Sequence, residues 1–289
     1  MLTIIVPVGN LERDQKNLEK ILFERAIPEE LELIIVLDLD LRSNNVSEFI
    51  HRIEVLGIKT VQSIGRNPNQ ARLDGLKVAT NEFIAFCDSD DVIDLSKLAG
   101  MSQSICNPGQ VNVFAFERID LRNAESSVSH HKGSRLGVIR FPGLSRMTFP
   151  KESLKSDFFV SATMGEDLTL LSGAILESDE IVFRKEKYYQ HIDHSKNRLS
   201  SSKNREVYMN NLSEFSLLLT TNLKNVNWKA VIVSSIYTSF VFSTAKFLGI
   251  KEWHTIFSYV KQAMSKNKKL GLCIFISFPL VFISRLSRN

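Results

Sequence analysis

The chain has 289 residues, of which 44% are hydrophobic and 24% are charged, so it can bury a substantial core. This composition excludes an intrinsically disordered chain. The three cysteines, Cys87, Cys106 and Cys273, form no CxxC or Cys/His pattern, which argues against a disulfide framework and favours a reduced, cytosolic setting. The apolar run at residues 2–6 has only the length of a strand, and we expect no secretion signal.

The net charge of +4 is unevenly distributed along the chain. Residues 222–289 contain ten Lys or Arg residues and one acid, Glu252, so this segment has a net charge of +9 and the preceding part is net acidic. A basic segment can bind nucleic acid or anionic lipid. The aromatic and aliphatic residues around these charges favour lipid and argue against nucleic acid.

Strands and helices alternate in the first third of the sequence. This order predicts an α/β domain with a mainly parallel sheet flanked by helices. Such a sheet binds ligands beyond the carboxyl ends of its strands, where Asp38 and Asp88 would face one cleft. Asn69 can cap the third helix. We expect strands at residues 2–6, 31–37, 58–64 and 82–87, and helices at 14–23, 46–56 and 69–79.

Later in the chain the pattern becomes helical. From residue 206 onwards it is helical throughout, so we predict two domains, 1–205 and 206–289. A spanning helix needs about twenty apolar residues, so the apolar stretch 228–248 could marginally span a membrane, while 270–283 is short. In-plane amphipathic helices fit both stretches better. Before them we expect strands at 111–118, 136–141 and 181–183, a polar loop at 123–134 and a helix at 167–176.

The segment FCDSDD at residues 86–91 ends the fourth predicted strand with three carboxylates. These charges repel one another unless a cation compensates them, and Mg²⁺ typically takes one or two carboxylates together with substrate phosphates. A metal here would neutralise the charge that develops on a diphosphate leaving group. The alternative is a solvated acidic turn that caps the next helix.

Three segments, in order, resemble the family 2 glycosyltransferases, which have the Rossmann-like GT-A fold. They are LTIIVPVGN at residues 2–10, ARLDGLKVATNEFIAFCDSDD at 71–91 and GEDL at 165–168, and the resemblance covers roughly residues 1–200. It implies a transferase that moves a sugar from a nucleotide-diphosphate donor, commonly a UDP-sugar, with inversion and with Mn²⁺ or Mg²⁺.

The resemblance also implies roles for individual residues. Asp38 matches the acid that contacts the base, Arg72 a basic residue near the donor pocket, and Asp167 the catalytic base, with Glu166 beside it. A positioned carboxylate suits this reaction because a sugar hydroxyl is a poor nucleophile. The implied donor-binding residues are Pro7, Asp38, Arg72, Asp88, Ser89 and Asp90, and the implied metal ligands are Asp88, Asp90 and Asp91.

Each assignment has a plainer alternative. Glu166 and Asp167 could be helix N-terminal acids that the helix dipole favours. Arg72 could be a surface charge, and Asp38 could be an ordinary acid at a strand end. The stretch YYQHIDHS at residues 188–195 resembles a family segment that lies near the diphosphate, although glutamine replaces the usual arginine. His191 or His194 could therefore contact phosphate or metal, or could be structural.

The sequence departs from the family pattern around the nucleoside pocket. Gly9 replaces the usual aromatic, LDLD at residues 37–40 replaces Asp-Asp-Gly-Ser, and Leu73 replaces the usual asparagine. A second hypothesis is therefore a degenerate, non-catalytic nucleotide-sugar-binding or scaffold protein of a glycan assembly complex. A nucleotidyltransferase fits less well, because GNLER at residues 9–13 is not a Gly-rich basic loop.

The basic tail has two interpretations. It could be a helical subdomain that packs on the α/β domain, or it could dock on an anionic membrane, where each basic residue contributes about 1 kcal/mol. Docking predicts a cytoplasmic enzyme, peripheral at the inner face of the cell membrane, that uses a glycan or polyprenyl-linked acceptor in surface polysaccharide synthesis. The aromatic residues expected to insert are Phe240, Phe242, Phe247, Trp253, Phe257 and Phe275.

Overall fold

A computed structural model describes residues 1–23, 27–38, 44–65, 67–105, 107–121, 127–160, 166–193 and 205–286. The first third alternates strands and helices, as the sequence predicts, and β2 has the predicted bounds. These elements are β1 (Leu2–Val8), α1 (Leu11–Phe23), β2 (Leu31–Leu37), α2 (Asn44–Val55), β3 (Lys59–Gln62), α3 (Pro68–Val78) and β4 (Phe83–Phe86).

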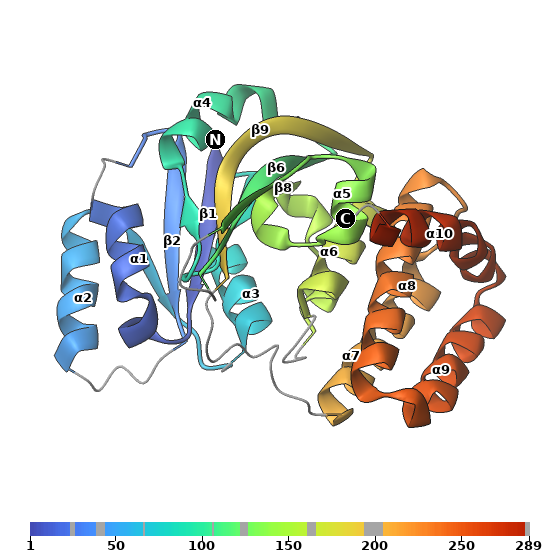
Figure 1. The fold of residues 1–289 in the computed structure, drawn as a ribbon. Coiled ribbons are helices and arrows are strands. Elements are labelled where there is room, and N and C mark those ends of the chain that lie inside the picture. Colours follow the sequence, from blue (N-terminus) through green and yellow to red (C-terminus); the bar gives the residue numbers. More distant parts are fainter. Residues whose placement is uncertain are drawn as a thin grey trace.

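The middle of the chain completes the sheet, and the last part is helical, with α7–α10 gathered beside α5 and α6 (Figure 1). The middle elements are β5 (Val92–Ile93), α4 (Leu95–Ile105), β6 (Gln110–Asp120), β7 (Ser127–His131), α5 (Arg135–Arg140), the 3-10 turn η1 (Leu144–Arg146), β8 (Met147–Pro150), α6 (Glu166–Glu177) and β9 (Glu180–Asp193). The helical part contains α7 (Arg205–Asn222), α8 (Trp228–Leu248), α9 (Trp253–Lys266) and α10 (Lys268–Leu286).

The sheet is mixed rather than mainly parallel. Its strand order is β3-β2-β1-β4-β8-β6-β9-β5, and β7 pairs with β6. Strands β1–β4 are parallel, as predicted, but β8 runs antiparallel to both β4 and β6. The sequence did not indicate β8 because its four residues, MTFP, are not part of a longer apolar run and end in a proline.

Three local predictions were wrong. The segment predicted as a strand at 136–141 is helix α5, because the Ser134 side chain accepts a hydrogen bond from Gly137 N (3.1 Å) and caps a helix. Part of the predicted loop at 123–134 forms strand β7. The cap of α3 is Asn67 rather than Asn69: the Asn67 side chain accepts from Gln70 N at 3.0 Å.

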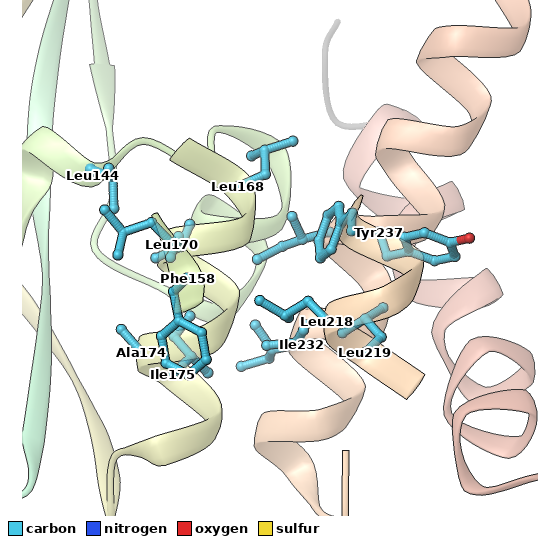
Figure 2. Packing of buried hydrophobic residues seen from close by; sticks show 14 of the residues in the cluster. Leu144, Phe158, Leu168, Leu170, Ala174, Ile175, Leu218, Leu219, Ile232 and Tyr237 are labelled. Atoms are coloured by element: carbon cyan, nitrogen blue, oxygen red, sulfur yellow. The ribbon is translucent and has the colours of Figure 1, made fainter. Parts of the chain in front are cut away.

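Buried apolar side chains of the described residues form one cluster on each face of the sheet. Successive residues of β1 alternate between them: Ile5 belongs to the first cluster and Ile4 to the second. The first cluster continues without interruption into the helical part. Figure 2 shows Ile175 of α6 facing Leu218 of α7 and Ile232 of α8. The boundary predicted at residue 205 therefore does not divide the hydrophobic core.

Within the described residues, α8 is the one helix long and apolar enough to cross a membrane. However, 56% of its most apolar window is buried inside the protein. The helix packs against α5, α6 and α10, so its apolar composition is accounted for by the core.

Candidate active site

The strand ends place three predicted site residues at one edge of the sheet. Strands β1, β2 and β4 are parallel neighbours, so their carboxyl ends meet there. Asp38 follows β2 and donates its backbone N–H to Val8 O at 3.0 Å, and Asp88 follows β4 and Cys87. Pro7 lies in β1 at the same end, buried and in register with Val36.

Arg72, on α3, lies at the centre of the site. Only 4% of the residue is exposed, yet it contacts acids from two distant segments. Its Nη2 donates to Asp88 Oδ1 at 2.8 Å, and its Nη1 lies 3.4 Å from Glu166 Oε1. Burial disfavours the guanidinium charge, but Asp88, Glu166 and Asp167 more than compensate and raise the pKa of Arg72. Arg72 is thus a buried cation and not a surface charge.

Asn69 fixes the start of α6 against α3. Its Nδ2 donates to Glu166 O (3.0 Å) and Val160 O (3.2 Å), and its Oδ1 accepts from Arg72 Nη1 (3.0 Å). The side chain is fully buried. Sequence reasoning assigned Asn69 to a helix cap and missed this role, because Val160 and Glu166 are more than ninety positions away.

Asp167 occupies the first turn of α6 beside this network. Desolvation, followed by the negative charge of Glu166, raises the pKa of Asp167 from its ordinary value of 3.8 to about 7, while Arg72 opposes the increase. A carboxylate with a pKa near neutrality is well matched to accepting a proton at physiological pH. The position at a helix N-terminus also favours the ionised form.

The acidic loop after β4 has side chains of two kinds: some are buried and bind neighbouring elements, and others remain accessible at the site. Asp91 is fully buried: its Oδ1 accepts from Ile192 N (2.7 Å), and its Oδ2 contacts the Tyr189 hydroxyl and His191 Nδ1 (3.1 Å). Ser89 donates to Asp14 Oδ2 at 2.6 Å, and both residues are buried. Asp91 therefore anchors the loop to β9, and Ser89 anchors it to α1.

Asp88 and Asp90 are the loop acids that remain accessible, with 40% and 29% of their side chains exposed. Desolvation and the charges of Asp91 and Asp88 raise the pKa of Asp90 to about 6, while Arg13, whose Nη2 lies 3.9 Å from Asp90 Oδ2, opposes this shift. Ser145 of η1 points its hydroxyl at Asp88 Oδ2 from 3.4 Å. Sequence reasoning missed Ser145, because nothing in its local sequence marks it.

The repulsion between these carboxylates suits a divalent cation, and oxygen ligands are what Mg²⁺ and Mn²⁺ prefer. Among the described residues, no group of three His, Cys, Asp or Glu side chains is arranged to hold a metal. The protein can thus supply Asp88 and Asp90, and a metal held there would need further oxygens from a ligand. His191 faces Asp91, while His194 and Gly165 lie outside the described residues.

The chain is similar to known proteins in both sequence and structure. A family sequence profile described as glycosyl transferase family 2 matches residues 3–163. A search of curated protein sequences finds no match. Among solved structures, residues 1–349 of S. aureus TarS in complex with UDP-GlcNAc superpose with a TM-score of 0.72 at 17% identity, covering 99% of this chain and 87% of that one.

The same TarS fragment in complex with UDP has a TM-score of 0.67 at 16% identity, over 99% of this chain and 87% of that one. Identity this low establishes a common fold and nothing more. That fold includes the helical part, since the match spans almost the whole chain. The profile match covers more than half of the residues, and the structural match gives the fold. The chain therefore belongs to glycosyltransferase family 2 and has the GT-A fold.

Proposed function

We propose that this glycosyltransferase moves a sugar from a nucleotide-diphosphate donor to a hydroxyl of a glycan or lipid-linked acceptor, with inversion at the anomeric carbon. The observation that supports this proposal best is the Arg72 network. It links Asp88, at the end of β4, to the first turn of α6, which carries Asp167. A donor-binding acid and a carboxylate of raised pKa thereby belong to one site.

In the proposed reaction, the Asp167 carboxylate takes the proton of the acceptor hydroxyl as its oxygen attacks the anomeric carbon. The bond from that carbon to the diphosphate oxygen breaks, and the nucleoside diphosphate leaves with the electron pair. Arg72 and Glu166 hold the start of α6 and the Asp88 loop at a fixed separation, which keeps base and donor in reacting geometry.

A divalent cation, Mn²⁺ or Mg²⁺, would be held by Asp88 and Asp90 together with diphosphate oxygens, and would stabilise the charge of the leaving group. Asp38 would contact the base from the end of β2. The TarS structures hold UDP-GlcNAc and UDP, which supports a UDP-sugar as donor here. We place the reaction in surface polysaccharide synthesis, at the cytoplasmic face of the membrane.

A panel of nucleotide-sugars, tested for nucleotide release with and without Mn²⁺, examines this proposal. The Asp167→Asn variant should lose at least about a hundredfold in kcat while it still binds donor. The matched control is Asp157→Asn, which changes an exposed acid of the neighbouring 3-10 turn and should remain fully active. Full activity of Asp167→Asn would reject this residue as the base.

The rival hypothesis is a non-catalytic nucleotide-sugar-binding protein. It is motivated by residues 37–40, at the end of the second strand, which depart from the family pattern. The same panel separates the two functions. Thermal stabilisation by a donor with metal, without any nucleotide release in the presence of acceptors, would favour a binding protein. The retained Asp88, Asp90 and Asp167 favour the enzyme.

A further inference from the structure

Helix α10 has one face buried in the protein and the other face exposed, and both faces are apolar. The buried face, which includes Leu270, Cys273 and Val281, packs on α5, α8 and α9, and the Ser277 hydroxyl bonds Thr238 of α8 at 3.1 Å. The exposed side carries large apolar side chains, with Phe275 75% and Phe282 65% exposed. The exposed apolar residues of α10 are Leu272, Phe275, Ile276, Phe278, Phe282 and Ile283.

These six side chains lie on one side of the helix and form a continuous stripe, the Leu272–Ile283 stripe. Lys268, Leu272, Phe275, Pro279 and Phe282 follow one another at spacings of four and three residues, which places them on the same side of the helix. A soluble helix normally carries charged residues on its outer side, and a helix that is apolar all round is normally covered on all sides. The stripe therefore requires something to cover it.

The apolar surface extends from α10 onto α9. Phe278 packs edge-on against Phe242 of α8 (5.8 Å between ring centroids), and Phe242 contacts Phe257 of α9 (6.5 Å). Phe257 in turn lies 5.4 Å from Trp253, and both of these rings are partly exposed. Phe240, which the sequence suggested as an inserting residue, is only half-buried and packs on Phe215 of α7 (6.3 Å).

Charge distinguishes between the possible occupants of this surface. The segment that contains it has a net charge of +9, and Glu252, its acid, is paired with Arg205 at 2.8 Å. A second copy of the chain would bring two such basic regions together, which costs energy. An anionic bilayer offers apolar tails for the stripe and negative headgroups for the lysines, among which Lys268 lies on the stripe itself.

We propose that α10 lies in the plane of an anionic bilayer, with the Leu272–Ile283 stripe inserted at the boundary between headgroups and acyl chains. The purpose of this docking rests on the proposed function, because docking would bring the active site to an acceptor held in the membrane. Helix α10 packs on α5, and the chain then leads to η1, where Ser145 contacts Asp88. Helix α5 and the following residues up to Ser145 thus connect the docking helix α10 to the acidic loop.

Vesicle co-sedimentation of the full chain tests this proposal, with vesicles of phosphatidylcholine alone or mixed in equal parts with phosphatidylglycerol. The wild type should bind the anionic vesicles, and the Phe275→Ser/Phe282→Ser variant should bind them at least about tenfold more weakly. The control variant Val55→Ser/Ile64→Ser also changes two exposed apolar residues, both outside the helical part, and should bind as the wild type does.

Two results would overturn the proposal. One is equal vesicle binding by the Phe275→Ser/Phe282→Ser variant and the wild type. The other is a wild-type dimer in light scattering that this variant converts to a monomer, which would assign the stripe to a second copy of the chain. Nucleotide release with a water-soluble acceptor should be unchanged in the variant, so a failure of docking is distinguishable from a failure of the proposed transferase activity.

Discussion

Arg72 illustrates, at the scale of single residues, how the fold gives one side chain several roles. Its guanidinium is buried, and it would be unstable there without the carboxylates of Asp88 and Glu166. The same pairing holds together the loop after β4 and the start of α6, which are far apart in the sequence. Because lysine offers a point charge in place of a planar fork, it could not make both contacts with the same geometry.

The raised pKa of Asp167 has consequences for both activity and stability. A base must be ionised, so turnover should rise with pH and level off above a pH of about 7. A carboxyl whose folded pKa is raised holds its proton more tightly in the folded state than in the unfolded state. Its contribution to stability is therefore lost as pH rises from about 4 to about 7.

Asp167→Asn cannot ionise and should consequently be more stable than the wild type at pH 8, by on the order of 2 kcal/mol, and indistinguishable from it near pH 4. Urea denaturation at the two pH values measures this difference. If the variant is less stable than the wild type at pH 8, then burial of the carboxylate is not what raises its pKa.

The Asp91 side chain should be structural, although the resemblance assigns it to the metal. Asn has one acceptor oxygen in place of two, so Asp91→Asn must lose acceptance from either Ile192 N or the Tyr189 hydroxyl, and should destabilise the fold by about 2 kcal/mol. The Mn²⁺ concentration needed for half-maximal activity should stay unchanged, whereas Asp90→Asn should raise it. A large shift of that concentration in Asp91→Asn, with stability retained, would restore the metal assignment.

At the scale of elements, helix α3 positions the site because it packs closely on the sheet. A Cβ at Gly75 would lie 2.5 Å from Ile5 Cγ2 and 2.9 Å from Val36 Cγ2, so Gly75→Ala must displace the helix that carries Arg72. We expect a loss of about 1–3 kcal/mol, which outweighs the gain in helix propensity of about 1 kcal/mol, and reduced activity.

Gly100→Ala, in α4, is the matched control for this change. Within the described residues, a Cβ at Gly100 would meet no atom within 4 Å, so only the gain in propensity remains. This variant should be stabilised by about 0.5–1 kcal/mol and fully active. Thermal denaturation and nucleotide release measure both variants, and a stabilised Gly75→Ala would mean that α3 is free to move on the sheet.

The elements also show what a sequence can indicate. Continuous apolar runs mark β1 and β2 because both faces of these strands are buried, and β2 was predicted with its actual bounds. The short apolar run in α5 fits both the period of a strand and the period of a helix. The Ser134 cap favours the helix. Strand β9 was predicted only at 181–183, since its burial pattern does not alternate regularly and its residues are mixed in polarity.

The same limit applies to the site. The motifs indicated Asp38, Arg72, Asp88 and Glu166 from their places near strand ends and helices, and the structure brings Arg72 into contact with Asp88 and Glu166. Contacts such as Tyr189 with Asp91 join residues separated by 98 positions and depend on how β9 crosses the sheet. No local pattern encodes such a crossing, so the sequence did not indicate that the Asp91 side chain contacts β9.

For the whole molecule, the sheet and the helical part share one hydrophobic core, so the sheet should depend on the helices for its stability. Truncation after Lys224 would remove α8–α10, whose Ile232, Ile236 and Leu270 belong to the same cluster as Leu171 of α6. Each such side chain contributes about 1.5–3 kcal/mol of burial energy, and a whole domain is stable by only about 5–15 kcal/mol. The truncated chain should therefore not fold.

We expect the full chain to unfold in a single cooperative transition by calorimetry, and the chain truncated after Lys224 to lack any such transition and to aggregate. The Phe275→Ser/Phe282→Ser variant provides the control, because it alters the outer face of α10, leaves the shared core intact and should keep the wild-type melting temperature. Two separate transitions in the full chain, or a soluble truncated chain with a transition of its own, would show that the sheet and helices α8–α10 fold independently despite the core that they share.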